Sequence, residues 1–368
     1  MSIRLAKPLL TDVEFRSVRK VLRSGNLVQG KNVERFERNL ASLLGVKHAV
    51  ALSSATAALH LTVLGLDLKA ADEVIVPDFT FPAPVNVIEL AGAKPVFVDI
   101  DLKTFNIDPE SVEACITKRT KAILVVHQFG RVADMKPIMR IARRYRLKVI
   151  EDAACALGAR YSGKMAGDLA DAACFSFHPR KIITTGEGGA VVTNNSSLAQ
   201  RVRMLRSHGL VRSRSNHMDL MTPGLNYRMT EMQAAIGVQQ LKRLPSLLAD
   251  RRRICRIYTA ELTQGPLLLP EFIQDQHTFQ SYIVVFPKSV NRDRIIRSLK
   301  LNGIETTIGS YAVHALAYYK KKYPSCGAFP NSERAFASSL ALPVPYGMKA
   351  ADIRRVSRVL TNLCKSCR

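Results

Sequence analysis

Two side chains that could do chemistry follow apolar stretches of the sequence. Asp152 comes directly after the apolar residues Val149 and Ile150, and Lys181 lies just beyond the apolar run 173–177. Both runs are typical of buried strands, so each side chain is expected at a strand end, where α/β proteins bind ligands. Taken singly, Asp152 is equally suited to a strand-end cap or turn, and Lys181 to an ordinary surface position.

The two residues together favour one cofactor chemistry. Lys181 follows Asp152 by 29 residues, which places both at the ends of successive strands. An enzyme that uses pyridoxal phosphate (PLP) needs a lysine that carries the cofactor as a Schiff base and an acid that holds its pyridine nitrogen. The pair therefore predicts PLP as cofactor, with Lys181 and Asp152 as the catalytic residues.

A third motif, SSATAAL at residues 53–59, lies where a strand turns into a helix. Small residues allow the backbone to approach an anion, and a helix start offers free N–H groups with a favourable dipole. Thr56 adds a hydroxyl. The motif fits a phosphate site, although an ordinary helix N-cap has the same composition.

These residues need a scaffold, and the sequence predicts one of alternating strands and helices. Short, continuously apolar segments that alternate with helical patterns indicate a mainly parallel sheet covered on both faces. The expected strands are residues 49–52, 73–77, 95–98, 122–126, 148–150, 173–177 and 190–193. The expected helices are residues 11–22, 32–44, 54–66, 83–91, 135–145 and a helix that contains 112–116.

The last third of the chain predicts a smaller domain. A helical pattern is expected from residue 226 to about 247, followed by a basic helix over 247–262, strands at 282–286 and 304–307, and a helix at 350–363. Because a chain of 368 residues is too long to fold around one small hydrophobic core, we expect a large domain at 1–246 and a small one at 247–368.

Composition excludes some classes of protein. Apolar residues make up 47% and charged residues 23%, which is globular rather than disordered. The formal charge of +24 attracts anions but does not choose among them. We find no interleaving of basic and aromatic residues that would indicate a nucleic-acid site, and no apolar stretch long enough to span a membrane. Cys364 and Cys367 form a single CxxC spacing, which alone cannot build a zinc site with four ligands. Seven cysteines without a framework suit a cytoplasmic protein.

At this point the motifs resemble a known family, the sugar-nucleotide aminotransferases of the DegT/DnrJ/StrS type. The resemblance covers nearly the whole chain and rests on ordered motifs: LVQG at 27–30, SSATAAL, DEVIVP at 72–77, TF at 80–81, VDID at 98–101, EDAA at 151–154, FSFHPRK at 175–181, EGG at 187–189 and GLNYRM at 224–229. It implies the three-layer α/β/α fold of PLP-dependent transferases of fold type I, with a smaller C-terminal α+β domain.

The resemblance also implies roles for individual residues. Lys181 forms the Schiff base and moves the proton, and Asp152 keeps the pyridine nitrogen protonated. Phe81 stacks on the ring, while Asn226 reaches the phosphate of the neighbouring subunit in a homodimer. The resemblance implies that Thr56, the backbone of Ala57 and Ser176 contact the phosphate. It also implies that Cys155 contacts the cofactor, and that Arg228 and His314 contact the nucleotide sugar.

Two positions depart from the family pattern. Ala55 stands where glycine commonly precedes the phosphate-binding threonine, and it is small enough for a helix start. Cys155 stands where the family usually carries glutamine or histidine next to the cofactor. A thiol is a poor hydrogen-bond partner, so tuning of the ring or substrate choice is expected to differ.

The expected activity is transfer of an amino group from an amino acid, by resemblance glutamate, to a keto sugar linked to a nucleotide. Three alternatives stay open. Relatives act on keto-cyclitols, and others are sugar dehydratases that use pyridoxamine phosphate, although these carry histidine where this chain has Lys181. A non-catalytic regulator that binds nucleic acid is the alternative from a different class, and no DNA-binding module supports it.

Overall fold

The computed structural model describes residues 2–212, 217–273 and 275–366. Its centre is a sheet of seven strands in the order β1-β10-β9-β6-β5-β2-β4, in which β10 alone runs against its neighbours. This confirms the expected, mainly parallel sheet. The strands are β1 (His48–Leu52), β2 (Glu73–Pro77), β4 (Lys94–Val98), β5 (Thr120–Val126), β6 (Lys148–Asp152), β9 (Ala172–Ser176) and β10 (Gly189–Thr193).

Apolar side chains cover both faces of this sheet. In β2, Ile75 points into one hydrophobic cluster, while Val74 and Val76 point into another on the opposite face. Such alternation of two apolar faces is what a sheet between two helical layers requires. Helices α2 (Lys31–Leu44), α5 (Pro109–Ala114), α6 (Met135–Tyr145) and α8 (Glu231–Leu262) pack on the first face, and α3 (Ala55–Gly65), α4 (Ala83–Leu90) and α7 (Ser196–Arg206) on the second.

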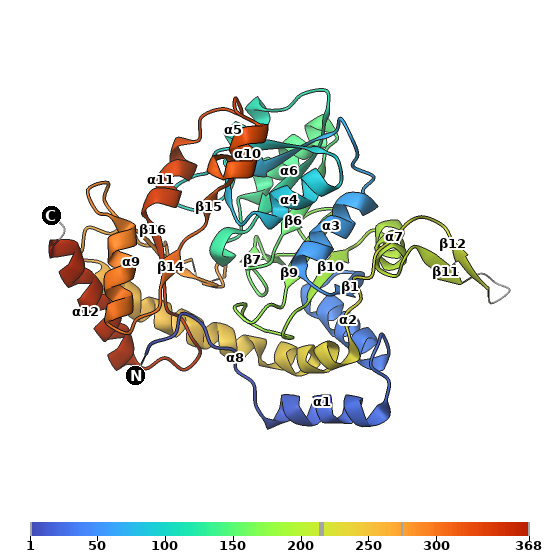
Figure 1. Ribbon diagram of the computed structural model, residues 1–368, viewed down its shortest axis with the longest axis horizontal. Coiled ribbons are helices and arrows are strands. Elements are labelled where there is room, and N and C mark those ends of the chain that lie inside the picture. Colours follow the sequence, from blue (N-terminus) through green and yellow to red (C-terminus); the bar gives the residue numbers. More distant parts are fainter. Residues whose placement is uncertain (1, 213–216, 274, 367–368) are drawn as a thin grey trace.

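A second hydrophobic core belongs to the C-terminal third. An antiparallel sheet of β13 (Tyr282–Val285), β16 (Ser339–Leu342) and β14 (Thr307–Ile308) packs with α9 (Arg292–Leu301) and α12 (Ala350–Ser366). Ile3 joins this core and bridges to Ile304, so the N-terminal segment lies beside C-terminal elements (Figure 1). The boundary at 246/247 stays a prediction, and it falls inside α8.

Three predicted elements of this region are wrong in their bounds. Residues 226–247 and 247–262 are not two helices, because α8 is a single helix that begins at Glu231 behind a capping box of Thr230 and Gln233. The segment before it is extended, since Asn226 and Arg228 form bridges to Ser207 and Leu52. The strand expected at 304–307 is the shorter β14, which starts where that segment ends.

The remaining elements are short and connect the larger ones. They are β3 (Phe79–Thr80), η1 (Gln128–Gly130), β7 (Arg160–Tyr161), β8 (Lys164–Met165), β11 (Leu210–Arg212), β12 (Met218–Leu220), β15 (Tyr311–Ala312), η2 (Val313–Ala315), α10 (Ala317–Lys322) and α11 (Pro330–Ser338). The β11–β12 hairpin projects from the body (Figure 1). No helix of the described residues is long and apolar enough to cross a membrane. Cys367 of the CxxC pair lies outside the described residues.

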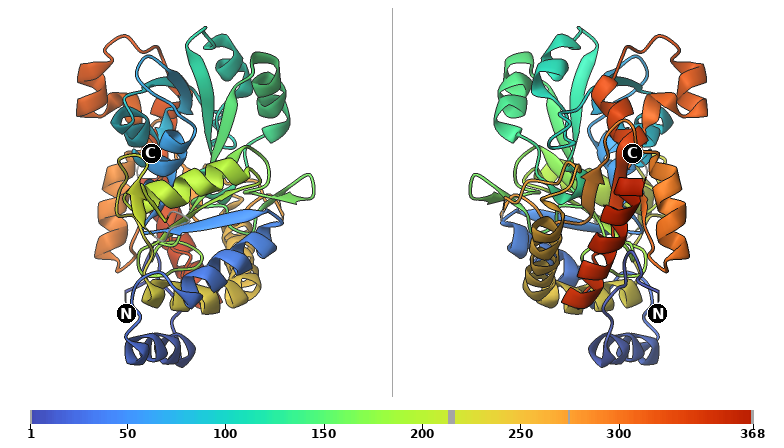
Figure 2. Two further views of the ribbon diagram at one scale, coloured as in Figure 1. Left: turned by 90° about the vertical axis from the view of Figure 1, so that its right-hand side faces the viewer. Right: turned by 90° about the vertical axis from the view of Figure 1, so that its left-hand side faces the viewer.

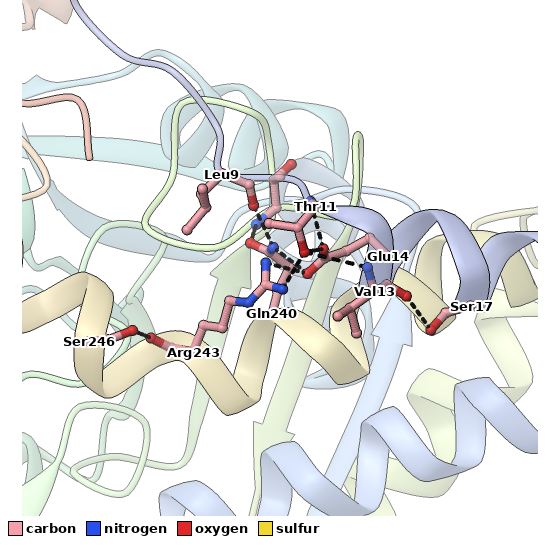
Figure 3. A network of polar contacts seen from close by, with 9 residues as sticks. Leu9, Thr11, Val13, Glu14, Ser17, Gln240, Arg243 and Ser246 are labelled. Atoms are coloured by element: carbon pink, nitrogen blue, oxygen red, sulfur yellow. Dashed lines mark hydrogen bonds and ion pairs between the residues drawn. The ribbon is translucent and has the colours of Figure 1, made fainter. Parts of the chain in front are cut away.

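The first helix, α1 (Asp12–Ser24), lies along α8 (Figure 1), and both views of Figure 2 show it beneath that helix. Thr11 caps it, and the buried carboxylate of Glu14 accepts hydrogen bonds from Thr11 N (2.9 Å) and Gln240 Nε2 (3.0 Å) and pairs with Arg243 Nη1 (2.8 Å) (Figure 3). Gln240 Oε1 lies 3.5 Å from the backbone N of Thr184, three residues after Lys181. This network therefore links the first helix to the loop that carries Lys181.

The charge of Glu14 should stabilise the fold. Burial alone would raise its pKa, but hydrogen bonds from Thr11 and Gln240 hold the pKa below its usual value. A lowered carboxyl pKa contributes stability at neutral pH that is lost as the pH falls through the folded-state value. We expect Glu14→Gln to lower the free energy of unfolding by about 2 kcal/mol at pH 7, and by less in acid.

Chemical unfolding of Glu14→Gln at several pH values measures this effect. Glu34→Gln is the control, because its pair with Arg38 is solvent-exposed and should change stability by less than about 0.5 kcal/mol. Equal losses in the two variants would contradict the assignment.

Candidate active site

A cavity of about 700 Å³ opens at the carboxyl ends of the parallel strands. Its walls include Asp152 and Ser176, the last residues of β6 and β9, and Thr56 in the first turn of α3. Because β10 is reversed, β1 runs parallel to β9, and α3 therefore starts at this same edge. The topology thus gathers the three predicted motifs around one space, as expected for an open α/β sheet.

Asp152 is the buried acid of the cavity. It ends β6 rather than following the strand, and only 7% of its surface is exposed. Its Oδ1 accepts a hydrogen bond from Ala154 N (3.0 Å). Burial raises the pKa of this carboxyl, with the Ala154 hydrogen bond and the charge of Lys181 acting in the opposite direction. The ionised form is therefore costly unless a cation lies next to it.

Lys181 reaches the same cavity from the loop after β9. Its backbone N donates to the His178 carbonyl (2.8 Å), and its Nζ lies 3.1 Å from Cys155 Sγ. The unusual residue after EDAA thus contacts the amine directly. A thiol accepts hydrogen bonds weakly, so Cys155 leaves the amine available for chemistry.

The start of α3 supplies donors for an anion. Ser54 Oγ accepts from Ala57 N (3.0 Å) and the Ser54 carbonyl from Ala58 N (3.0 Å), which leaves the N–H groups of Ala55 and Thr56 without a helical acceptor. The backbone of Ala57, expected to bind phosphate, is therefore occupied by the cap.

Gly189 lets this helix start approach the sheet. A Cβ at Gly189 would lie 2.3 Å from the carbonyl atoms of Ser54 and 2.5 Å from Ala55 N. The last glycine of the EGG motif is therefore required by the close contact between β10 and the turn that starts α3. Ser176 pairs with Gly189 across the strands and lines the cavity beside it.

Phe81 lines the cavity with 63% of its surface exposed, so its ring is available for stacking. Three other predicted residues lie outside the described lining. Asn226 is exposed, and Arg228 bridges to Leu52. His314 is held by the buried Asp78, through its backbone N to Oδ1 (2.8 Å) and through Nδ1 to Oδ2 (2.7 Å).

Sequence reasoning missed several lining residues. His127 and Gln128 come directly after β5, as Ala154 and Cys155 come shortly after β6, and that placement after a buried strand was an available signal. His127 is fully buried, and its Nδ1 accepts from Ala133 N (3.2 Å), so its Nε2 donates to Glu151 (2.8 Å). No local pattern marks the lining residues from the C-terminal third, which are Gln280, Ser281, Gly309 and Ser310.

The comparisons with known proteins agree with this geometry. The model of the DegT/DnrJ/EryC1/StrS aminotransferase family matches residues 8–361. The chain belongs to this family. It is 41% identical over 336 residues to the GDP-perosamine synthase of Caulobacter vibrioides, with 90% of each chain covered.

Solved structures of this family share the whole fold. PseC of Helicobacter pylori, an aminotransferase of pseudoaminic acid biosynthesis, superposes with a TM-score of 0.94 at 29% identity over 100% of both chains. Spr1654 of Streptococcus pneumoniae, in its PLP form, gives 0.95 at 28% identity, also over 100% of both, and a pyridoxamine phosphate (PMP) form is known. The expected fold type I is confirmed, and the chain is a PLP-dependent aminotransferase.

The residues of the cavity fit this cofactor. An amine, a buried acid and a helix start with free N–H groups line one space. Thr80 Oγ1 is buried there without a hydrogen-bond partner in the described part of the chain. Such an orphaned hydroxyl calls for a ligand atom, because buried polar groups are rarely left unpaired.

The contact at Gly189 leads to a prediction about cofactor binding. Gly189→Ala would push Ser54 and Ala55 away from β10, and we expect the affinity for PLP to fall about 10- to 100-fold because the anion donors move. Titration with PLP, followed by absorbance, measures this. Gly265→Ala is the matched control, since Gly265 is exposed and its nearest neighbour is 3.3 Å away. Equal affinities would refute the role of Gly189.

Proposed function

We propose that this chain transfers an amino group from glutamate to a keto sugar carried on a nucleotide. The observation that carries the proposal is the convergence of Lys181 and Asp152 on one cavity beside a helix start. The similarity to GDP-perosamine synthase, which extends over 90% of both chains, supports a nucleotide-linked sugar as acceptor.

Lys181 is the proposed proton carrier. When bound, PLP supplies an aldehyde that takes up the amino group and a ring that withdraws electrons from the reacting carbon. Lys181 Nζ would hold the cofactor, take a proton from the carbon of the amino donor and return it to the neighbouring carbon. Cys155 Sγ, at 3.1 Å, lies close enough to orient this amine.

Asp152 and the start of α3 would hold the two ends of the cofactor. The buried carboxylate of Asp152 would keep a proton on the pyridine nitrogen, because an adjacent cation offsets the cost of its own charge. The free N–H groups of Ala55 and Thr56, with the hydroxyls of Thr56 and Ser176, would bind the phosphate. Phe81 would stack on the ring from the open side.

The proposal includes a homodimer with shared active sites. Asn226 is exposed and lies outside the described lining of its own cavity, which leaves it free to reach a partner. The projecting β11–β12 hairpin exposes apolar side chains that a second copy would cover, namely Leu210, Val211, Met218 and Leu220. Sedimentation at twice the chain mass of 40.8 kDa would support this, and a monomer would contradict it.

A substrate panel tests the proposed reaction. With PLP and glutamate, we expect amines to form from keto sugars linked to GDP, UDP or dTDP, and not from a keto-cyclitol. Lys181→Ala should reduce the rate by about a thousandfold or more, because proton transfer is lost. Amination of the cyclitol alone, or loss of a sugar hydroxyl without gain of an amine, would contradict the proposal.

A further inference from the structure

The thiol of Cys155 and the amine of Lys181 meet in the active-site cavity. Cys155 Sγ lies 3.1 Å from Lys181 Nζ, and both side chains line the cavity and are partly exposed. The proposed reaction uses the amine, but it gives the sulfur no chemical step. The contact therefore leaves a nucleophilic sulfur next to a nucleophilic nitrogen, and the chemistry of this pair has still to be explained.

Backbone contacts hold both residues in place. The Cys155 carbonyl accepts a hydrogen bond from Thr278 Oγ1 (2.7 Å), and a Cβ at Gly130 would lie 2.6 Å from that carbonyl oxygen. On the other side, Lys181 N donates to the His178 carbonyl (2.8 Å). The two side chains thus face each other from fixed positions of the main chain, and the flexible stem of the lysine allows its amine to move closer to the sulfur.

The surroundings of Cys155 suit a reactive thiol. The residue opens into a cavity of about 700 Å³, which a small oxidant can enter. The amine of Lys181 lies beside the sulfur, and the guanidinium of Arg251 acts on it electrostatically. Partly exposed sulfur in electropositive surroundings is typical of cysteines that undergo oxidation.

Four other cysteines are less suited to oxidation. Cys174 and Cys255 are fully buried, and burial raises the pKa of both thiols. Cys115 and Cys326 are half-buried, and burial raises the pKa of these two thiols as well. A raised pKa leaves less of the thiolate, which is the form that reacts with a peroxide. We therefore expect an oxidant to act first at Cys155.

We propose that Cys155 and Lys181 form a reversible covalent cross-link between sulfur and nitrogen when a peroxide oxidises the thiol. In the first step the sulfur attacks the peroxide, the O–O bond breaks, and the sulfur carries a hydroxyl in place of its hydrogen while one water leaves. In the second step the neutral amine of Lys181 attacks this sulfur. The N–S bond forms, the S–O bond breaks, and the hydroxyl leaves with an amine proton as a second water. The protein loses two hydrogens, and the peroxide is reduced to two waters.

A dithiol reverses the cross-link. One of its thiols attacks the sulfur of Cys155, the S–N bond breaks, and the amine of Lys181 takes up a proton. The second thiol then releases Cys155 and closes a disulfide within the reductant.

The cross-link and the cofactor compete for the same amine. While the N–S bond exists, Lys181 cannot hold PLP, and PLP attached to Lys181 protects the amine from the sulfur. This consequence rests on the proposed function, whereas the cross-link itself depends only on the contact of the two side chains. The modification therefore stops the enzyme only in states in which the amine is free.

Mass spectrometry of three samples tests the cross-link, and hydrogen peroxide is the oxidant in each. The samples are the PLP-loaded enzyme, the same enzyme mixed with glutamate, and the protein stripped of cofactor. We expect the stripped protein to become lighter by two hydrogens, about 2 Da, and to yield a peptide that joins positions 155 and 181 until dithiothreitol separates it. The stripped protein should also bind PLP, followed by absorbance, only after dithiothreitol is added.

The other two samples report on the amine. The PLP-loaded enzyme should form the cross-link roughly tenfold more slowly than the stripped protein, because its amine is not free to capture the oxidised sulfur. Glutamate should restore the faster rate, since it releases the amine from the cofactor.

Two serine variants are the matched controls. Cys155→Ser should abolish the cross-link in all three samples, because serine keeps the size of the side chain but removes the sulfur. Cys115→Ser should leave the cross-link unchanged, since Cys115 lies at the end of α5, outside the described lining of the cavity.

The outcomes separate the inference from the proposed function. An unmodified Cys155 in the stripped protein, or one that only gains oxygen without joining Lys181, would overturn the inference. A cross-link that persists in Cys155→Ser would also overturn it. Cross-linking that is equally fast in the PLP-loaded and stripped samples would support the inference and contradict the attachment of PLP to Lys181.

Discussion

Two acids end β6 side by side, and their opposite surroundings organise the site. Glu151 is fully buried, and its carboxylate accepts hydrogen bonds from Gly167 N (2.9 Å), Leu169 N (3.0 Å) and His127 Nε2 (2.8 Å). Asp152 points the other way, into the cavity, where burial raises its pKa. Hydrogen bonds from within the protein therefore stabilise the charge of Glu151, whereas the charge of Asp152 needs a cation from a ligand. A protonated pyridine nitrogen, held against Asp152 by a cofactor whose other end is attached to Lys181, would meet that need.

The sheet supplies the geometry for this arrangement. Parallel strands present Asp152 and Ser176 at one edge, and the single reversed strand β10 brings Gly189 against Ser54, so that the start of α3 opens into the same cavity. The loop from β9 to β10 then carries Lys181 across the opening.

Much of this arrangement was predictable because it depends on local patterns. The strand at 73–77 and the helix at 135–145 match the structure to the residue, since their apolar periodicity is set by burial on one or two faces. The segment 226–230 was not predictable as helix or strand from composition, because its extended form depends on bridges to distant strands. Gln280 and Ser310 line the cavity together with Lys181, and Asp78 holds His314, so both arrangements join residues far apart in the chain. No local signal reports such pairs.

The thermal stability of Asp152→Asn, with and without PLP, tests the central claim most directly. A carboxyl with a raised folded-state pKa loses stability as the pH rises from its unfolded to its folded value, and asparagine has no such loss. The account predicts that the cofactor-free variant at pH 7 is as stable as the wild type or more stable by about 1 kcal/mol, while PLP stabilises it less than the wild type. A cofactor-free variant that is clearly less stable, together with equal stabilisation of both proteins by PLP, would contradict the account.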